Sequence, residues 1–312
     1  MDHPLLNSRR CGRRIPFFGL LSFLSLSGCS LFNDPSLELE PACGQVTLTP
    51  LSAAEHVKVS RKHILESFGS FGCVSCPGAE SRLLPYIHPE LNSPGYNPDL
   101  IVVNYHVKFG SIDDPWVTSA TQARYDQSFA NSLPQVTLDG SNAPFGIRET
   151  DVSFQQGQYD SLVRRIGRQD SLTYVDLKLD TNSLSYDTLA QKLRLRFTVF
   201  NRDNKTQGQL AFRVLAVKNL SVTFSYYPNN PWEVIVAETA DRDTSGCPLA
   251  IGGLPPLTSR SFVMALDLAS ESRKKPPPAN AENPKNYAVV VIAKGSSGII
   301  QNVVAFHYRP MP

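Results

Sequence analysis

Residues 63–77, HILESFGSFGCVSCP, decide the architecture that the sequence predicts. The apolar run within residues 61–70 predicts a buried strand. Cys73 and Cys76 follow it, and Pro77 is typical of the first turn of a helix. A cysteine at a helix N-terminus is favoured in its thiolate form. We therefore expect Cys73 to be an attacking thiolate and Cys76 a resolving thiol, with a disulfide between them in the oxidised state.

Strand and helix patterns alternate along the chain as far as residue 170. Helical patterns cover residues 77–88, 115–131 and 157–168, and strand patterns cover residues 100–107 and 134–139. Alternation of this kind is typical of an α/β domain.

Strand patterns dominate the remainder of the chain. Every second residue from Leu193 to Val199 is apolar, which predicts a strand with one buried face. Strands at short spacing, with turn residues between them, indicate an antiparallel β-sandwich. The predicted strands cover residues 172–179, 193–200, 210–217, 221–226, 233–238, 261–268, 287–293 and 300–308.

The N-terminus has the three parts of an export signal. Arginines within residues 9–14 precede an apolar run at 15–26, and the tetrapeptide LSGC occupies residues 26–29. This tetrapeptide resembles the lipobox of bacterial lipoproteins, which implies cleavage before Cys29 and acylation of its thiol. The apolar run is too short for a helix that spans a bilayer. We expect residues 1–28 to be a lipoprotein signal peptide and Cys29 to carry the membrane anchor.

The composition favours a folded protein and excludes one class of partner. Hydrophobic residues make up 41% of the chain and charged residues 19%, which is a globular balance. Beyond residue 28 the chain has one more acidic than basic residue. A chain near neutrality does not attract the phosphates of nucleic acid, so we expect no nucleic-acid partner.

The cysteines indicate an oxidising compartment. One of the six lies in the predicted signal peptide and Cys29 is the predicted lipid anchor, which leaves Cys43, Cys73, Cys76 and Cys247. If Cys73 pairs with Cys76, then Cys43 and Cys247 are left to each other. Four cysteines allow three pairings, so the sequence alone does not fix the connectivity.

Residues 64–140 resemble a thioredoxin fold. The motif E-x-F-x-x-x-x-C-x-x-C-P at 66–77 is similar to the start of two bacterial groups. One is a secreted thioredoxin-like family of unassigned function, and the other consists of outer-membrane lipoproteins with a thioredoxin-like half followed by a β domain. Further matches are Tyr105-His106-Val107, Asp114-Pro115-Trp116, Gln122-x-Arg124-Tyr125 and Leu133-Pro134-Gln135-Val136.

Two departures from the thioredoxin pattern affect the predicted chemistry. Gly72 stands where the family has an aromatic residue before the first cysteine. The family's buried acid lies six residues before that cysteine, whereas Glu66 lies one residue earlier and Ser67 holds the family's position. Glu66 is therefore one residue out of register with the proton acceptor of the family.

The predicted fold class is an α/β thioredoxin-like domain at 59–170, followed by an antiparallel β-sandwich domain at 171–312. A tether and lead-in strand at 29–58 would precede them. The resemblance also implies that Pro134 is cis and docks a substrate peptide beside the cysteine pair. It further implies an envelope protein, lipid-anchored in the outer membrane and facing the periplasm or the cell surface.

The leading functional hypothesis is a thiol–disulfide oxidoreductase-like envelope lipoprotein that acts on the cysteines of exported proteins. Cys73, Cys76 and Pro134 would be the catalytic residues. We expect no soluble cofactor and no metal, because the chemistry resides in two thiols.

Two alternatives remain open at the level of sequence. In the first, the chain is a non-catalytic interaction or structural lipoprotein, and the Cys73–Cys76 disulfide only stabilises it. In the second, Cys73, Cys76 and His106 bind copper, since thiolates suit Cu(I). The sequence does not fix the direction of disulfide exchange, the substrate or the oligomeric state.

Overall fold

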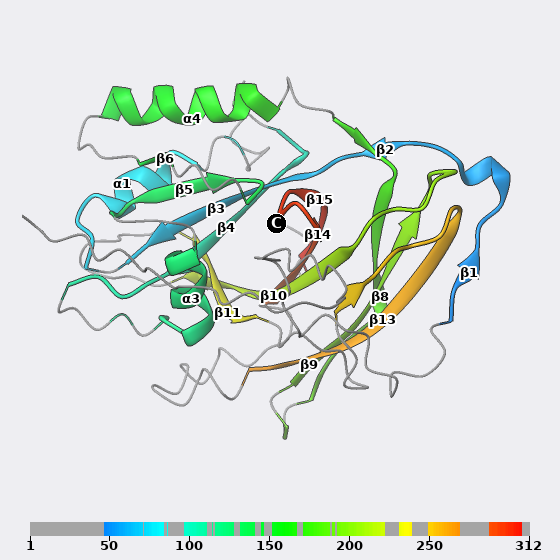
Figure 1. Ribbon diagram of the computed structural model, residues 1–312. Coiled ribbons are helices and arrows are strands. Elements are labelled where there is room, and N and C mark those ends of the chain that lie inside the picture. The colour runs from blue at the N-terminus through cyan, green and yellow to red at the C-terminus, as the bar shows by residue number, and fades with distance from the viewer. Residues whose placement is uncertain are drawn as a thin grey trace, which may run out of the picture. The chain divides into compact units, whose positions relative to one another are not determined.

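Two large β-sheets and a few helices make up the described part of the computed structural model (Figure 1). All described residues belong to one unit, which spans residues 37–312. They are residues 47–70, 72–83, 86, 97–110, 114, 116–127, 132–140, 145–146, 152–166, 171–187, 189–190, 192–221, 231–238, 249–268 and 287–307.

The smaller sheet has four antiparallel strands in the order β1-β13-β9-β8. The alternation predicted from Leu193 to Val199 is confirmed, because these apolar side chains are buried and those between them are more exposed. The strands are β1 (Thr49–Pro50), β8 (Val175–Asp187), β9 (Lys192–Asn201) and β13 (Thr258–Asp267).

The larger sheet has nine strands and combines both halves of the chain. Its order is β15-β14-β10-β11-β4-β3-β5-β6, with β12 beside β10. The pairs β3–β4 and β4–β11 are parallel, and the other pairs are antiparallel. The strands are β3 (His63–Gly69), β4 (Leu100–His106), β5 (Gln135–Leu138), β6 (Phe145–Gly146), β10 (Leu210–Ser221), β11 (Pro231–Glu238), β12 (Ala250–Ile251), β14 (Tyr287–Gly295) and β15 (Ile300–His307).

The two sheets pack face to face and enclose the largest apolar cluster. Phe197 and Phe262 of the smaller sheet stack at 5.0 Å between ring centroids, and Phe212 of β10 lies against both. All three rings are buried. This part of the chain is a β-sandwich, as the alternating strands predicted.

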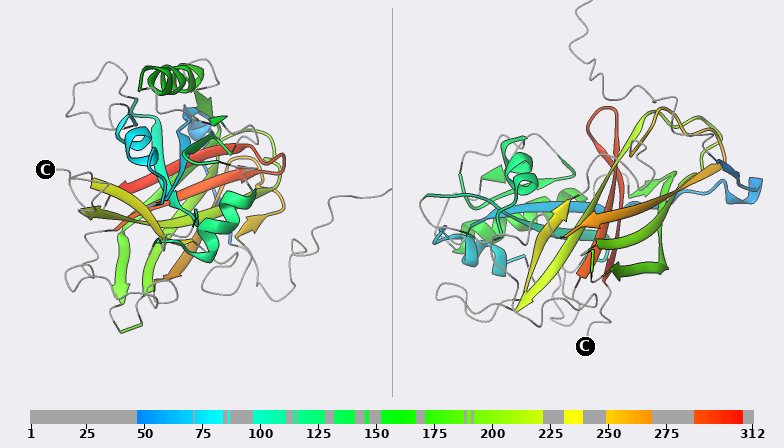
Figure 2. Two further views of the ribbon diagram at one scale, coloured as in Figure 1. Left: turned by 90° about the vertical axis from the view of Figure 1, so that its left-hand side faces the viewer. Right: turned by 90° about the horizontal axis from the view of Figure 1, so that it is seen from below.

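Helices cover the strands β3, β4 and β5 on both faces (Figures 1 and 2). Leu162 of α4 packs with Leu65 and Leu83 in one buried cluster. Tyr125 of α3 packs on the opposite face, tilted against Phe68 at 5.7 Å between ring centroids. The helices are α1 (Cys76–Ser81), α3 (Ser119–Gln127) and α4 (Val152–Ile166); a 3₁₀ turn, η2 (Ala53–Glu55), and a two-stranded pair, β2 (Val59–Ser60) with β7 (Leu172–Thr173), complete the described elements.

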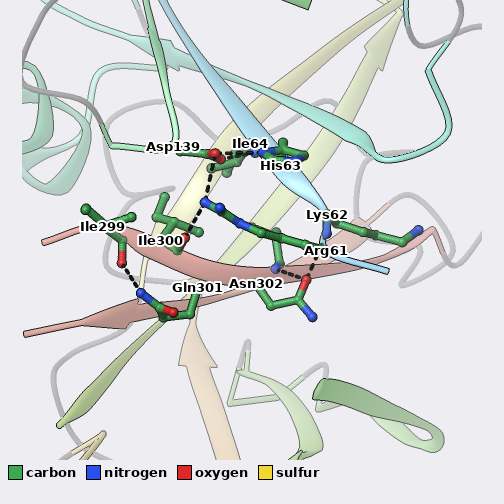
Figure 3. A network of polar contacts seen from close by, with 10 residues as sticks. Arg61, Lys62, His63, Ile64, Asp139, Ile299, Ile300, Gln301 and Asn302 are labelled. Carbon is green, nitrogen blue, oxygen red and sulfur yellow. Dashed lines mark hydrogen bonds and ion pairs between the residues drawn. The ribbon is translucent and has the colours of Figure 1, made fainter. Parts of the chain in front are cut away.

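A polar network fastens the start of β3 to the end of β5 and to β15 (Figure 3). The Asp139 carboxylate accepts hydrogen bonds from Arg61 Nη2 at 3.1 Å and from the Ile64 amide at 3.1 Å, and it lies 2.7 Å from His63 Nδ1. The same Arg61 nitrogen donates to the Ile300 carbonyl at 2.7 Å. Segments far apart in the sequence are thereby held together by a partly buried ion pair.

The predicted fold class, an α/β thioredoxin-like domain followed by an antiparallel β-sandwich domain, is wrong. The chain is mostly β-sheet, and most strand pairs are antiparallel. The strands expected to form a separate α/β domain lie in the same nine-stranded sheet as β10, β11, β14 and β15. The reason is that β11, which follows residue 170, completes the edge of β4. Periodicity identifies a strand but does not reveal which strand covers its edge.

Candidate functional site

The two cysteines of the motif lie in the turn that connects β3 to α1. The Cys73 amide donates to the Ser70 carbonyl at 3.0 Å, and the Cys76 amide donates to the Cys73 carbonyl at 3.2 Å. Helix α1 begins at Cys76, so Pro77 stands in its first turn, where its missing N–H costs no hydrogen bond. The sulfurs of Cys73 and Cys76 are joined in a disulfide, with an S–S distance of 2.02 Å.

The disulfide is shielded from solvent although its turn reaches the surface. Cys73 is 3% exposed and Cys76 is fully buried, whereas Val74 between them is 83% exposed. The hydroxyl of Ser75 lies 3.6 Å from Cys73 Sγ. A thiolate that attacks Cys73 therefore has to displace part of this turn, or the residues that cover it.

A buried histidine–aspartate pair lies at the same end of the sheet. His106 is the last residue of β4 and stands opposite Gly69, the last residue of β3. His106 Nδ1 lies 2.7 Å from Asp114 Oδ2, and both side chains are almost fully buried. A carboxylate at Nδ1 fixes the orientation of the imidazole ring.

Pro134 also stands at this end of the sheet. It immediately precedes β5, whose first residue, Gln135, pairs with Phe68 near the end of β3. The Leu133–Pro134 peptide bond is cis, and Pro134 is buried. The ends of β3 and β4 and the start of β5 thus bring the cysteine turn, His106 and Pro134 to one edge of the sheet. The catalytic roles of Cys73, Cys76 and Pro134 stay predictions.

Glu66 is not a proton acceptor for the cysteines. Burial raises the pKa of its carboxyl, but the hydrogen bonds and charge of Arg124, together with the charge of Arg213, outweigh burial and lower the pKa to about 2. Glu66 also alternates with Leu65 and Ser67 along β3, so it faces away from the side on which α1 and α4 pack. The carboxylate is ionised at neutral pH and serves an ion pair.

Sequence reasoning missed the three cationic side chains that gather at Glu66. Arg124 of α3 pairs with both carboxylate oxygens of Glu66, and Arg213 Nη1 of β10 lies 3.3 Å from Glu66 Oε1. Lys294 of β14 is close enough for the charges of Glu66, Arg124 and Arg213 to shift its pKa. We call Arg124, Arg213 and Lys294 the cationic cluster. A signal was present, because Arg213 is a charged residue inside an apolar strand pattern and Lys294 directly follows another one.

Metal binding finds no support in the described part of the chain. No group of three histidine, cysteine or carboxylate side chains able to hold a metal ion occurs among its residues. Cys73 and Cys76 are bonded to each other, and His106 contacts Asp114. The copper hypothesis therefore lacks a three-ligand cluster there.

Several predicted features lie outside the described residues. They are the signal peptide at 1–28, the lipidation site Cys29, and both partners of the Cys43–Cys247 disulfide. Among the helices that the structure describes, none is long and apolar enough to cross a membrane.

No family model matches the chain, and no curated protein matches it. HBP35 of Porphyromonas gingivalis is a similar solved structure, with a TM-score of 0.56 and 12% sequence identity over 80% of this chain and 75% of that chain. A domain of the outer membrane lipoprotein Omp28 from the same organism has a TM-score of 0.26 and 12% identity, over 45% of this chain and 92% of that one.

The likeness to HBP35 concerns the fold alone, because 12% identity carries no residue roles across. The described architecture is therefore shared with at least one solved protein over most of its length. The likeness to the Omp28 domain is too weak at a TM-score of 0.26 to carry an argument.

Proposed function

We propose that the protein is an exported bacterial lipoprotein, anchored through Cys29, whose Cys73–Cys76 disulfide exchanges with thiols of other exported proteins. The observation that carries the proposal is the disulfide at the end of β3, with Pro134 and the His106–Asp114 pair at the same edge. The LSGC tetrapeptide at 26–29 supports the anchor and the envelope location.

The exchange itself requires two thiols of a substrate and no further oxidant. A substrate thiolate attacks Cys73 Sγ, the Cys73–Cys76 bond breaks, and Cys76 leaves as a thiolate with the bonding electron pair. A second substrate thiolate then attacks the substrate sulfur of the mixed disulfide and releases Cys73. The substrate dithiol loses two electrons and the cysteine pair gains them. His106, oriented by Asp114, is a candidate to hold one of the released protons.

A second candidate function rests on the burial of the disulfide. Cys73 and Cys76 are both almost inaccessible, and structural disulfides are typically shielded in this way. In that case the pair stabilises the turn before α1, and the β-sandwich serves as a binding or structural module of the envelope.

The reduction potential of the pair separates the two candidates. The full-length protein in detergent micelles is equilibrated with glutathione mixtures, alkylated, and analysed by mass spectrometry of the peptide that contains Cys73 and Cys76. A working exchange site is expected between about −270 and −120 mV. A potential below about −300 mV would overturn the exchange proposal and favour the structural role.

Variants test the roles of single residues in that exchange. Cys76→Ser leaves Cys73 as a single thiol. It is expected to attack a small-molecule disulfide, release one half of it as a thiol and keep the other half in a stable mixed disulfide, and Val74→Ala in the same background is expected to retain this reaction. If Cys73→Ser traps the mixed disulfide through Cys76 and Cys76→Ser does not, Cys73 is not the reacting sulfur.

The anchor is tested by cell fractionation. Cys29→Ser is expected to shift the protein from the membrane fraction to the soluble fraction, because it removes the acylated thiol. Cys43→Ser is the matched control and is expected to stay with the membrane. If Cys29→Ser also stays there, the proposed anchor is wrong.

A further inference from the structure

More positive than negative charge gathers around the buried carboxylate of Glu66. Arg124 Nε donates to Glu66 Oε1 at 2.8 Å, and Arg213 Nη1 lies 3.3 Å from the same oxygen. The Thr137 hydroxyl donates to Oε2 at 3.2 Å. Lys294 of β14 pairs with Ala211 of β10, two residues from Arg213, so the two cationic side chains stand on the same face of the sheet. Among the described residues, Glu66 is the one carboxylate within ion-pair distance of this cationic cluster.

Two members of the cluster keep donors that no described residue uses. The guanidinium of Arg124 has five N–H groups, and its hydrogen bonds to Glu66 take two of them. The ammonium of Lys294 has three N–H groups, and none of them makes a hydrogen bond or ion pair within the described ranges, from 47–70 to 287–307. A buried or half-buried cation without an acceptor is costly.

The two arginines affect the pKa of Lys294 more than Glu66 does. Burial lowers the pKa of Lys294 below its ordinary value, and the charges of Arg124 and Arg213 lower it further, while Glu66 acts in the opposite direction. The carboxylate therefore does not offset the two arginines at the position of the ammonium. An anion beside the ammonium of Lys294 would offset its repulsion by the two arginines and would accept its hydrogen bonds.

The cluster is partly open to solvent. The side chain of Arg124 is 12% exposed and that of Arg213 is 22% exposed, while Lys294 is half-buried. Charged hydrogen bonds in such surroundings are screened less than those at an open surface.

We propose that Lys294 and Arg124, supported by Arg213, form a binding site for a small anion that bears a carboxylate or phosphate group. Glu66 holds the two guanidinium groups in place, and the unused donors of Lys294 and Arg124 bind the anion. The site is separate from the cysteine turn, since Glu66 lies on the face of β3 opposite to α1 and α4.

Chemical labelling of lysine tests the site without any knowledge of activity. The full-length protein is acetylated in trace amounts at mildly alkaline pH, in sodium chloride, sodium phosphate or sodium succinate of equal ionic strength. Mass spectrometry gives the rate at Lys294 and at the exposed Lys205. A bound anion both covers the amine and stabilises its protonated form, so we expect the rate at Lys294 to fall about tenfold, with saturation, and that at Lys205 to stay constant.

A slower acetylation of Lys294 in phosphate, in succinate or in both supports the site and identifies which anionic group it binds. An unchanged rate at Lys294, or a fall that is parallel at Lys205 and does not saturate, would overturn the proposal, because it would reflect ionic screening alone.

A variant pair gives a second measurement. The anion is expected to raise the melting temperature of the wild type and of Lys205→Gln, because it binds the folded state. Lys294→Gln is expected to lose this increase. Equal increases in both variants would contradict the site, and the labelling of the wild type remains decisive if Lys294→Gln does not fold.

Discussion

Glu66 is a charge that the protein keeps ionised in its interior. A fully buried carboxylate would ordinarily be protonated, since burial penalises the charged form. Here the two-fold contact with Arg124 and the charge of Arg213 reverse that preference and lower the pKa to about 2. The contacts connect β3 to α3 and β10, so one side chain links three elements around the same interior.

The stability of the protein is expected to depend on the ionisation of Glu66. Its folded-state pKa lies below the ordinary value of 4.5, so the ion pair contributes fully above about pH 4.5 and is lost as the pH falls towards about 2. The contribution is on the order of 3 kcal/mol. Urea denaturation across this pH range is expected to show the loss in the wild type.

Glu66→Gln identifies the source of that pH dependence. The variant is expected to be destabilised at neutral pH and to show a flatter stability curve between about pH 4.5 and 2, because the titrating group is gone. Asp126→Asn is the control at an exposed carboxylate of α3 and is expected to change the curve little. A wild-type slope in Glu66→Gln would show that other carboxylates cause the dependence.

At the scale of elements, α4 is held to the sheet by its apolar face. Tyr159, Leu162 and Ile166 lie one turn apart and are buried against β3, β4 and β5. The same spacing marked the helix in the sequence. The sequence around α4 is thus enough to predict a helix. The stability of that helix comes from its packing on the sheet rather than from helix propensity.

Truncation of the α4 face is expected to destabilise the protein. Leu162 is 1% exposed, so Leu162→Ala leaves a cavity between helix and sheet and is expected to cost about 3 kcal/mol. The measurement is the free energy of unfolding in urea. Ser161→Ala, at the exposed neighbouring position, is expected to change it by less than about 0.5 kcal/mol. A similar cost in both variants would argue that the helix does not pack as described.

At the scale of the whole molecule, the network around Asp139 joins the two halves of the chain. Asn302 Oδ1 accepts from the Lys62 amide at 3.0 Å, and Asn302 Nδ2 donates to the Val175 carbonyl at 2.8 Å. Arg61 bridges Asp139 and Ile300 close by (Figure 3). These contacts connect β3, β5, β8 and β15, so the same group of hydrogen bonds and ion pairs joins the two sheets.

Asp139→Asn is expected to loosen this junction. Asparagine fits the positive φ of 52° at this position, so the variant removes the charge and leaves the backbone unstrained. Loss of the charged partner of the partly buried Arg61 is expected to cost about 3 kcal/mol. Amide hydrogen exchange should show lost protection in β3 and in β15 together.

The matched control for the junction is Asp126→Asn on the exposed face of α3. It is expected to leave exchange in β3 and β15 unchanged. If Asp139→Asn affects β5 alone, the network does not couple the two halves of the chain.

The sequence determined the elements and the local chemistry. The strands at 63–69, 100–106 and 135–138, the helix turn after Cys76, and the alternating strands of the sandwich all follow from periodicity and from proline and cysteine placement. These signals are local, because side-chain spacing within a strand or helix is fixed by its own geometry. The same signals do not show which distant strand pairs with the edge of a given strand.

Tertiary structure decided how the elements join and what the buried charges do. The pairing of β11 with β4 merged the expected α/β domain into one largely antiparallel sheet. The pairing of Glu66 with Arg124 and Arg213 turned a candidate proton acceptor into a fixed anion. Both outcomes depend on residues far apart in the sequence, and a pattern read along the chain carries no information on which distant strand or charge arrives beside a given residue.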